Sequence, residues 1–284
     1  MQDFFHQSSF AMHTRFEVVW WGVDKSSSLA LFEEIRSLLD WMERQISCHD
    51  PQSQLYRLNR LARDRAVPVS DDLFQVLKTV EDYRERTLGC FDPNFLHPPN
   101  AQQTGARLIF DNSSKSIRFN DPATQLDLGA VGKGLALEKI NNDILRNNVE
   151  HAFISFGESS ILTRGRHPIG DYWPLGLSDM HQPGKTLYAM KLTNHSVSVS
   201  STRKKTADGK AGTYHIYHPY HGKLIQQDKM VMVKSTSPVE AEVLSTALLV
   251  ADADLQQQIL KNFAVEEAVQ IIYHHQSPKI IRLI

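Results

Sequence analysis

Apolar residues recur along the chain with two different periods, and each period predicts one kind of element. In the segment 27–47 they stand three or four positions apart, which is typical of an amphipathic helix. These apolar positions are Leu31, Ile35, Leu38, Leu39, Met42 and Ile46. The segment 186–201, TLYAMKLTNHSVSVSS, instead alternates apolar and polar residues, as half-buried strands do.

Two further helices are predicted from their start signals. The segment 70–87 opens with a serine followed by two aspartates, which suits a capped first turn. The segment 237–260 is predicted to be one helix, with Ser237 as N-cap and Pro238 at the first helical position. Glu240 is placed to complete a capping box with Ser237.

Strand-like segments fill most of the remaining chain. They include 14–23, a hairpin over 107–121 with an Asn-Ser-Ser-Lys turn, the segments 151–165 and 172–179, and a pair near the C-terminus. Strands and helices do not alternate regularly, so we expect an α+β fold with mixed, largely antiparallel sheets and packed helices.

The chain is expected to form one domain over residues 1–284, because it shows neither an internal repeat nor a low-complexity linker. Its softest segment is FLHPPNAQQTGA, residues 95–106, whose prolines and polar residues mark a loop. A boundary between lobes, if the domain has one, is expected there.

Composition narrows the classes of function. The formal net charge of −1 gives no general attraction to nucleic acid or to a membrane surface, and neither is expected as a partner. The two cysteines, Cys48 and Cys90, form no CxxC motif and suggest reduced, packed thiols. The N-terminal residues lack a signal-peptide pattern, and no apolar run is long enough to span a bilayer. We therefore expect a soluble, cytoplasmic protein.

The stretch QLDLGAVGKGLALEKI, residues 125–140, places Asp127, three glycines and Lys133 between a strand-like and a helix-like run. Glycine amides at a helix N-terminus, with a lysine beside them, suit a phosphate group. The spacing fits neither a P-loop nor the Rossmann fingerprint. A tight strand-to-helix turn with a solvated Lys133 is the alternative interpretation.

A carboxylate and a hydroxyl share one face of the helix predicted over 237–260. Glu242 and Thr246 stand four positions apart, and their oxygens would suit a magnesium ion that keeps some waters or phosphate oxygens. The alternative is structural, because an acidic residue favours any helix start and a threonine can bond its own helix.

Three histidines follow a cluster of cations at residues 203–205. His215, His218 and His221 are spaced by three, but Pro219 disfavours a helix and a strand would point them to alternating faces. We expect a strand ending in a turn, with one histidine at most taking part in chemistry. The cations either face an anion or belong to a solvated loop.

Taken in order, several motifs resemble the ApbE-type FAD:protein FMN transferases. FAMHTRFEV resembles the family's first strand with its methionine, and SCHDPQSQLYRLN its Ser-x-x-Asp-Pro-x-Ser segment. TLGCFDP is similar to Thr-x-Gly-Ala-Phe-Asp-Pro, and DLGAVGKG to Asp-Leu-Gly-Gly-Ile-Ala-Lys-Gly. ISFGESSI, YHIYHPYHG and AEVLSTA stand where the family has Gly-Gly-Asp, His-Ile-Ile-Asp-Pro and Ala-Asp-Ala-Leu-Ala-Thr-Ala elements.

The resemblance implies an ApbE-like, T-fold-like architecture and an enzyme that cleaves FAD in the presence of Mg²⁺. Such an enzyme releases AMP and transfers FMN to a serine or threonine of an acceptor protein. By position, the metal would be held by Glu242, Thr246 and the carbonyl of Gly132, and His215 and Lys133 would be catalytic. The flavin nucleotide would be bound by Met12, Cys90, Phe91, Asp92, Asp127, Lys133 and Ile216.

The chain departs from the family pattern at several of these motifs. Glu242 replaces an aspartate, VSSTRKK stands in place of Ser-Gly-Asp-Tyr, and His218 takes an aspartate position. Four hypotheses follow: the transferase, an FAD hydrolase with water as acceptor, a flavin-binding protein without turnover, and an unrelated hydrolase or binding module that shares these turns by chance.

Overall fold

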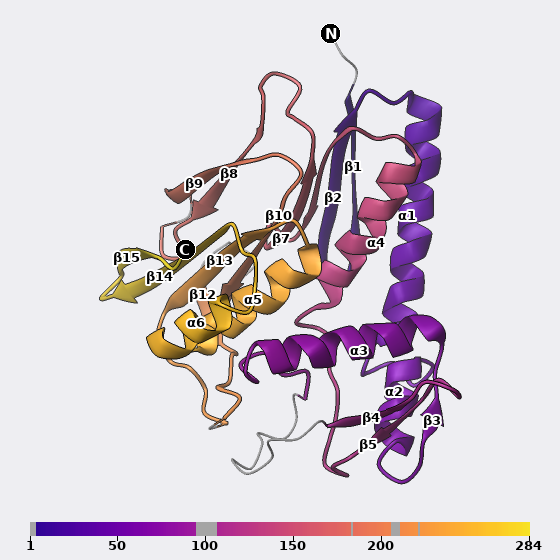
Figure 1. The fold of residues 1–284 in the computed structure, drawn as a ribbon. Helices are drawn as coiled ribbons and strands as arrows, with labels where there is room; N and C mark the ends of the chain where they lie inside the picture. Colours follow the sequence, from indigo (N-terminus) through magenta and orange to yellow (C-terminus); the bar gives the residue numbers. More distant parts are fainter. Residues whose placement is uncertain (1–3, 95–106, 183, 206–210, 221) are drawn as a thin grey trace.

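A large antiparallel sheet organises the computed structural model, which describes residues 4–94, 107–182, 184–205, 211–220 and 222–284 (Figure 1). Within these residues eight strands form the sheet in the order β1-β2-β6-β7-β10-β13-β14-β15. The strands are β1 Phe4–Ala11, β2 Thr14–Trp21, β6 His151–Phe156, β7 Ser160–Arg164, β10 Ser196–Ser201, β13 Lys229–Ser235, β14 Glu267–His274 and β15 Ser277–Arg282. Helices and antiparallel sheets are thus combined as the α+β expectation requires.

Helices cover one face of this sheet. The helices are α1 Lys25–Ile46, α2 Gln54–Leu61, α3 Asp71–Arg86, α4 Gly132–Arg146, α5 Pro238–Val250 and α6 Ala253–Leu260. α1, α4 and α5 lie along the sheet, and α5 contacts β10, β13 and α4 (Figure 1). α5 is buried nearly all round because it lies between the sheet and α4.

A second, smaller core lies on the opposite face of the sheet. Alternation along β2 sends Phe16, Val18 and Trp20 to the helix side, whereas Trp21 packs on the other side. There it meets the hairpin of β8 Trp173–Ser178 and β9 Thr186–Leu192, which contributes Trp173 to the same cluster. The sheet therefore has an apolar layer on each face.

Two smaller groups of strands complete the described structure. β3 Val67–Pro68, β4 Leu108–Asp111 and β5 Ser116–Phe119 form a three-stranded sheet in the order β3-β5-β4. β11 Arg203–Lys205 pairs with β12 Ala211–Tyr214. The predicted hairpin over 107–121 is confirmed, because β4 and β5 pair across the Asn-Ser-Ser-Lys turn.

The prediction of one helix over 237–260 is wrong. Ala251 has an extended backbone, with φ −66° and ψ 143°, and Asp252 caps a new helix by accepting from the Leu255 N–H at 2.9 Å. Glu240 does not close the expected capping box either, because its carboxylate accepts from the Ser235 hydroxyl at 2.8 Å. Ser237 does cap α5, through the Glu240 N–H at 3.2 Å.

Three other points bear on the sequence predictions. The proposed lobe boundary at 95–106 and His221 lie outside the described residues. β1 and α2 form elements that the sequence patterns did not predict. Among the described residues, no helix combines the length and the apolar character needed to cross a membrane.

Candidate functional site

One cavity of about 1230 Å³ passes from the helix face of the sheet to the hairpin face. The turn between β6 and β7, residues 157–159, lines it where it passes the ends of the strands. On the helix side the lining includes Lys133, Glu242 and Thr246. On the hairpin side it is apolar and includes Leu175, Leu177, Met180, Met190, Met230 and Met232.

Glu242 is the centre of a buried polar cluster at the start of α4 and α5. Its side chain is 3% exposed, and Lys133 Nζ lies 2.9 Å from Oε1. The Ser160 hydroxyl donates to the same oxygen at 2.5 Å, and the Gly134 N–H donates to Oε2 at 2.6 Å. These donors compensate the burial of the carboxylate. Lys133 is therefore paired rather than solvated, which differs from the solvated lysine of the alternative interpretation.

Gly134 explains how the two helices approach so closely. A Cβ at this position would lie 2.8 Å from the Pro238 carbonyl oxygen and 3.0 Å from the Val239 Cα. Both are backbone atoms, so a larger residue would force α4 and α5 apart. The glycine of the GKG stretch thus serves helix packing, and its amide is bound to Glu242 rather than presented to a phosphate.

Thr246 lies one turn after Glu242 and also faces the cavity. Its hydroxyl lies 3.2 Å from the Ser200 hydroxyl of β10. Ser245, its neighbour, lies 3.0 Å from the Ser198 hydroxyl and 2.8 Å from the Ser200 hydroxyl. The alternation of β10 turns these serines toward α5, so a row of hydroxyl groups joins the strand to the helix.

The segment before α4 and the segment after α3 bring the predicted flavin residues of the first half together. Asp127, Cys90, Phe91 and Asp92 line the cavity. Asp127 Oδ1 accepts from the Gly129 N–H at 2.8 Å, which orders the glycine turn. Burial raises the pKa of the Cys90 thiol to about 11, so the thiol stays protonated.

Asp92 is committed to a buried ion pair. Its Oδ2 lies 2.9 Å from Arg107 Nη2, and both side chains are less than one-tenth exposed. Burial raises the pKa of Asp92, although the Arg107 cation opposes this shift. The second oxygen accepts from the Asn94 N–H at 2.9 Å. Asp92 lines the cavity, and its role in binding flavin stays a prediction.

His215 and Ile216 also line the cavity, directly after β12. Burial, with a contribution from the Lys204 cation, lowers the pKa of His215. The imidazole is therefore neutral at pH 7, and its Nδ1 has no hydrogen-bond partner among the residues described. A neutral imidazole facing a cavity is able to accept a proton.

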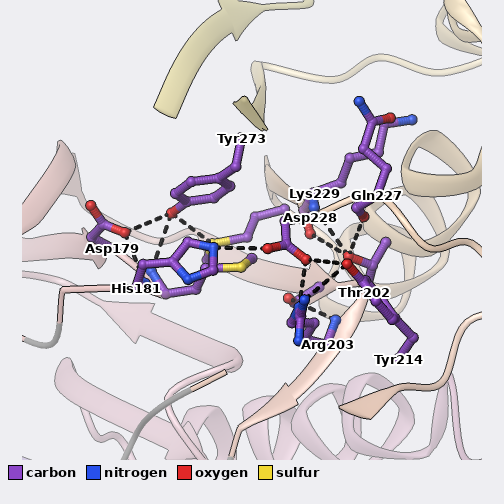
Figure 2. Close-up of polar contacts among 12 residues, drawn as sticks. Asp179, His181, Thr202, Arg203, Tyr214, Gln227, Asp228, Lys229 and Tyr273 are labelled. Carbon is purple, nitrogen blue, oxygen red and sulfur yellow. Dashed lines mark hydrogen bonds and ion pairs between the residues drawn. The ribbon is translucent and has the colours of Figure 1, made fainter. Parts of the chain in front are cut away.

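Arg203, the first member of the predicted cation cluster, lines the cavity but is neutralised. Asp228 Oδ1 accepts from Arg203 Nε and from the Tyr214 hydroxyl, the latter at 2.7 Å (Figure 2). His181 Nε2 lies 2.9 Å from the other oxygen of Asp228. This network ties the β11–β12 hairpin to the segment after β8. Lys204 also lines the cavity and is exposed.

Two predicted site residues do not line the cavity. Met12 occupies the turn between β1 and β2, with φ 51°, instead of a strand, and it packs partly buried against the main core. Gly132 is buried at the first position of α4, and a Cβ there would meet Ile46 Cδ1 at 3.3 Å. Their roles in binding flavin and metal stay predictions.

The donor set at α5 fits a hard cation. Glu242 supplies a carboxylate whose Oε2 has one hydrogen-bond partner among the described residues, and Thr246 adds a hydroxyl one turn away on the same wall. Lys133 already compensates part of the carboxylate charge. The residues present therefore suit Mg²⁺, and the ion would compete with Lys133 for Glu242 Oε1.

Several residues of this wall were not predicted from the sequence. Ser160 and Ser200, which hold Glu242 and Thr246, come from strands remote in sequence. The alternation of serine with valine in VSVSS is a signal that could have revealed Ser200. The methionines, and Asp179 which also lines the cavity, gave no local signal. Their shared position depends on how the β8–β9 hairpin folds over the sheet.

The ApbE family model matches residues 12–270. An FAD:protein FMN transferase of Klebsiella pneumoniae (strain 342) is 27% identical over 162 residues, which are 53% of this chain and 49% of the relative. This match spans about half the length of that relative. An FAD:protein FMN transferase of Chlamydia trachomatis is 25% identical over 243 residues, 76% of this chain and 74% of the relative.

The fold has a close counterpart among solved structures. The ApbE protein of Thermotoga maritima superposes with a TM-score of 0.82 at 22% identity, and the match covers 99% of this chain and 97% of that one. At 22% identity, the similarity to this structure shows the fold alone. The match to the ApbE family model spans residues 12–270, nearly the whole sequence. The chain belongs to the ApbE family.

Proposed function

We propose that this protein is an FAD:protein FMN transferase. It binds FAD, transfers the FMN moiety to a serine or threonine of an acceptor protein, and releases AMP. The observation that carries the proposal is one continuous cavity that joins Lys133, the Glu242–Thr246 pair and His215 to an apolar chamber. The relatives are FAD:protein FMN transferases, which agrees with this arrangement.

The reaction is a substitution at the phosphorus atom of the FMN half. The acceptor hydroxyl forms the new P–O bond, the P–O bond to the AMP oxygen breaks, and AMP carries away the negative charge. His215, neutral at pH 7, takes the proton of the hydroxyl, whose own pKa is too high for spontaneous ionisation. Lys133 contributes a positive charge beside the diphosphate.

Mg²⁺ belongs to this proposal. Glu242 and Thr246, with the carbonyl of Gly132 as a predicted third ligand, would hold the ion, which when bound neutralises charge on the diphosphate oxygens. Lys133, Ser160 and the Gly134 amide contact the Glu242 carboxylate and hold it at the cavity wall. Asp127, Cys90, Phe91 and Ile216 form the proposed wall around the nucleotide.

A second candidate is an FAD-binding protein without turnover. The specific observation that favours it is the engagement of Glu242, whose longer side chain already has three donors. If Mg²⁺ does not displace Lys133 from Glu242, the metal site stays occupied by the lysine, and FAD binds without being cleaved. An FAD hydrolase would use the same site with water as the acceptor.

One experiment separates these candidates. The protein is incubated with FAD, Mg²⁺ and a flavin-acceptor domain, and the products are analysed by intact mass spectrometry and by chromatography of AMP. We expect an FMN mass increase on the acceptor with an equal amount of AMP. AMP without acceptor labelling would identify the hydrolase. FAD binding without AMP for any acceptor would overturn the transferase and support the second candidate.

A further inference from the structure

Among the described residues, three lysine or arginine side chains line the cavity, and two of them are already paired with carboxylates. Lys133 Nζ lies 2.9 Å from Glu242 Oε1, and Arg203 is bound to Asp228. The third, Lys204, has no ion-pair partner in the part of the chain that the structure describes. Lys204 is therefore the cation of this wall that is available to an anionic group of a ligand.

The β11–β12 hairpin brings Lys204 close to His215. Arg203 and Tyr214 are directly opposite each other in its ladder, and both bind Asp228 (Figure 2). The next residue on each side, Lys204 or His215, lines the cavity. The Lys204 cation contributes to the lowered pKa of His215, so its charge reaches the imidazole. An anion bound by Lys204 would therefore lie beside the proposed base.

The backbone that carries Lys204 is fixed by its connection to β13. The Thr202 hydroxyl donates to the Gln227 carbonyl at 2.8 Å, and the Thr202 N–H donates to the Lys229 carbonyl at 3.0 Å. The His215 N–H in turn donates to the Thr202 carbonyl at 3.2 Å. Lys204 and His215 thus extend from one anchored hairpin, which keeps a binding residue and a base in a constant relation.

The proposed role of His215 locates the phosphoryl group under attack. The imidazole accepts the proton of the acceptor hydroxyl across about 3 Å, and the hydroxyl approaches phosphorus to about 3 Å, so this phosphorus lies about 6 Å from the imidazole. A lysine side chain on the neighbouring backbone spans such a distance. A proton on His215 would also be repelled by Lys204 unless an anion lay between them. The phosphoryl group is the anion that the reaction itself brings there.

We propose that Lys204 binds a non-bridging oxygen of the FMN phosphate, the phosphoryl group that the acceptor hydroxyl attacks. The inference rests on the proposed function and adds to it a second cation, on a different element from Lys133. Lys204 belongs to the segment VSSTRKK, where the chain departs from the family pattern. The lysine donates a charge-assisted hydrogen bond and takes no part in proton transfer, so the bonds that form and break are those already described. Its charge stabilises negative charge on the equatorial oxygens of the transition state.

Lys204→Gln is the variant that tests this contact, because it removes the charge and keeps much of the length of the side chain. Lys204 is exposed, so the melting temperature of this variant should equal that of the wild type. Lys204→Arg keeps the charge and should retain most of the function. Lys223→Gln is the matched control, since Lys223 is an exposed lysine of the following loop that does not line the cavity.

Fluorescence titration with FMN and riboflavin gives the first readout, because these ligands differ only in the phosphate. The titrations contain neither Mg²⁺ nor acceptor, so metal binding and turnover do not enter. We expect Lys204→Gln to weaken FMN binding by at least about tenfold and to leave riboflavin binding unchanged. Lys223→Gln should bind both ligands like the wild type. Unchanged FMN affinity in Lys204→Gln, or an equal loss with riboflavin, overturns the inference.

Steady-state transfer to a flavin-acceptor domain gives the second readout. Lys204→Gln should lower kcat/KM for FAD by at least about tenfold and leave the KM for the acceptor unchanged. A raised acceptor KM with unchanged FMN affinity would assign Lys204 to an acidic group of the acceptor and overturn the inference. Loss of FMN affinity in the variant, with no transfer by the wild type to any acceptor, would support the phosphate contact and overturn the proposed function alone. A wild type that binds neither FMN nor riboflavin would overturn both.

Discussion

His215 is a half-buried imidazole at the cavity wall, and burial lowers its pKa below the ordinary value of 6.5. A base with a depressed pKa is active above that pKa and loses activity as the pH falls through it. We expect kcat/KM for FMN transfer to have an acid limb with its midpoint below pH 6.5. His215→Gln should reduce the rate by about a hundredfold or more and remove this limb. An identical limb in the variant would show that another group titrates.

Thr246 permits a test of the metal site with little structural cost, because within the described part of the chain its hydroxyl has one hydrogen-bond contact, Ser200 at 3.2 Å. Thr246→Ala should raise the Mg²⁺ concentration for half-maximal turnover by at least about tenfold. The free energy of unfolding should change by less than about 1 kcal/mol. Thr246→Ser retains the oxygen and should behave like the wild type. The same Mg²⁺ response in all three proteins would remove Thr246 from the ligand set.

At the scale of elements, the junction of α4 and α5 depends on Gly134. Gly134→Ala introduces a Cβ 2.8 Å from the Pro238 carbonyl oxygen, so the helices must separate. We expect a loss of about 1–3 kcal/mol in the free energy of unfolding, measured by urea denaturation. Gly132→Ala is the control, since its Cβ meets only the tip of Ile46 at 3.3 Å. If both variants lose the same free energy, close helix packing is not the reason for glycine.

Local patterns predicted the elements whose signals are strong and continuous. The helical spacing over 27–47 corresponds to α1, and the predicted serine cap at position 70 starts α3. The predicted cap at Ser237 starts α5. β1 was missed because it is an edge strand exposed along most of its length, which gives no alternation. The break at Asp252 was missed because apolar residues continue across it without a glycine or proline.

Only the site residues that belong to a local sequence pattern could be predicted. The Glu242–Thr246 pair follows from helical spacing, and both residues do face the cavity. The contacts that complete the site join distant segments: Ser160 reaches Glu242 across 82 positions and Tyr273 reaches Asp179 across 94. No local period encodes such pairs, since they arise from strand order in the sheet.

At the scale of the whole molecule, the cavity connects the two cores. Its wall includes Val250 of the helix-side core and Met232 of the hairpin-side core. A ligand that fills it contacts both layers, so binding should stabilise them together. By linkage, FAD at a hundred times its dissociation constant adds about 2.7 kcal/mol to the free energy of unfolding.

We therefore expect saturating FAD to raise the melting temperature by several degrees in a single transition. Far-ultraviolet circular dichroism and tryptophan fluorescence should follow the same curve, because Trp20 reports on the helix-side core and Trp173 on the hairpin-side core. GTP at equal concentration is the control for phosphate and metal effects, since it lacks both rings of FAD. A shift seen by one probe alone would mean that FAD contacts a single layer, and the continuous site inferred from the cavity would then be wrong.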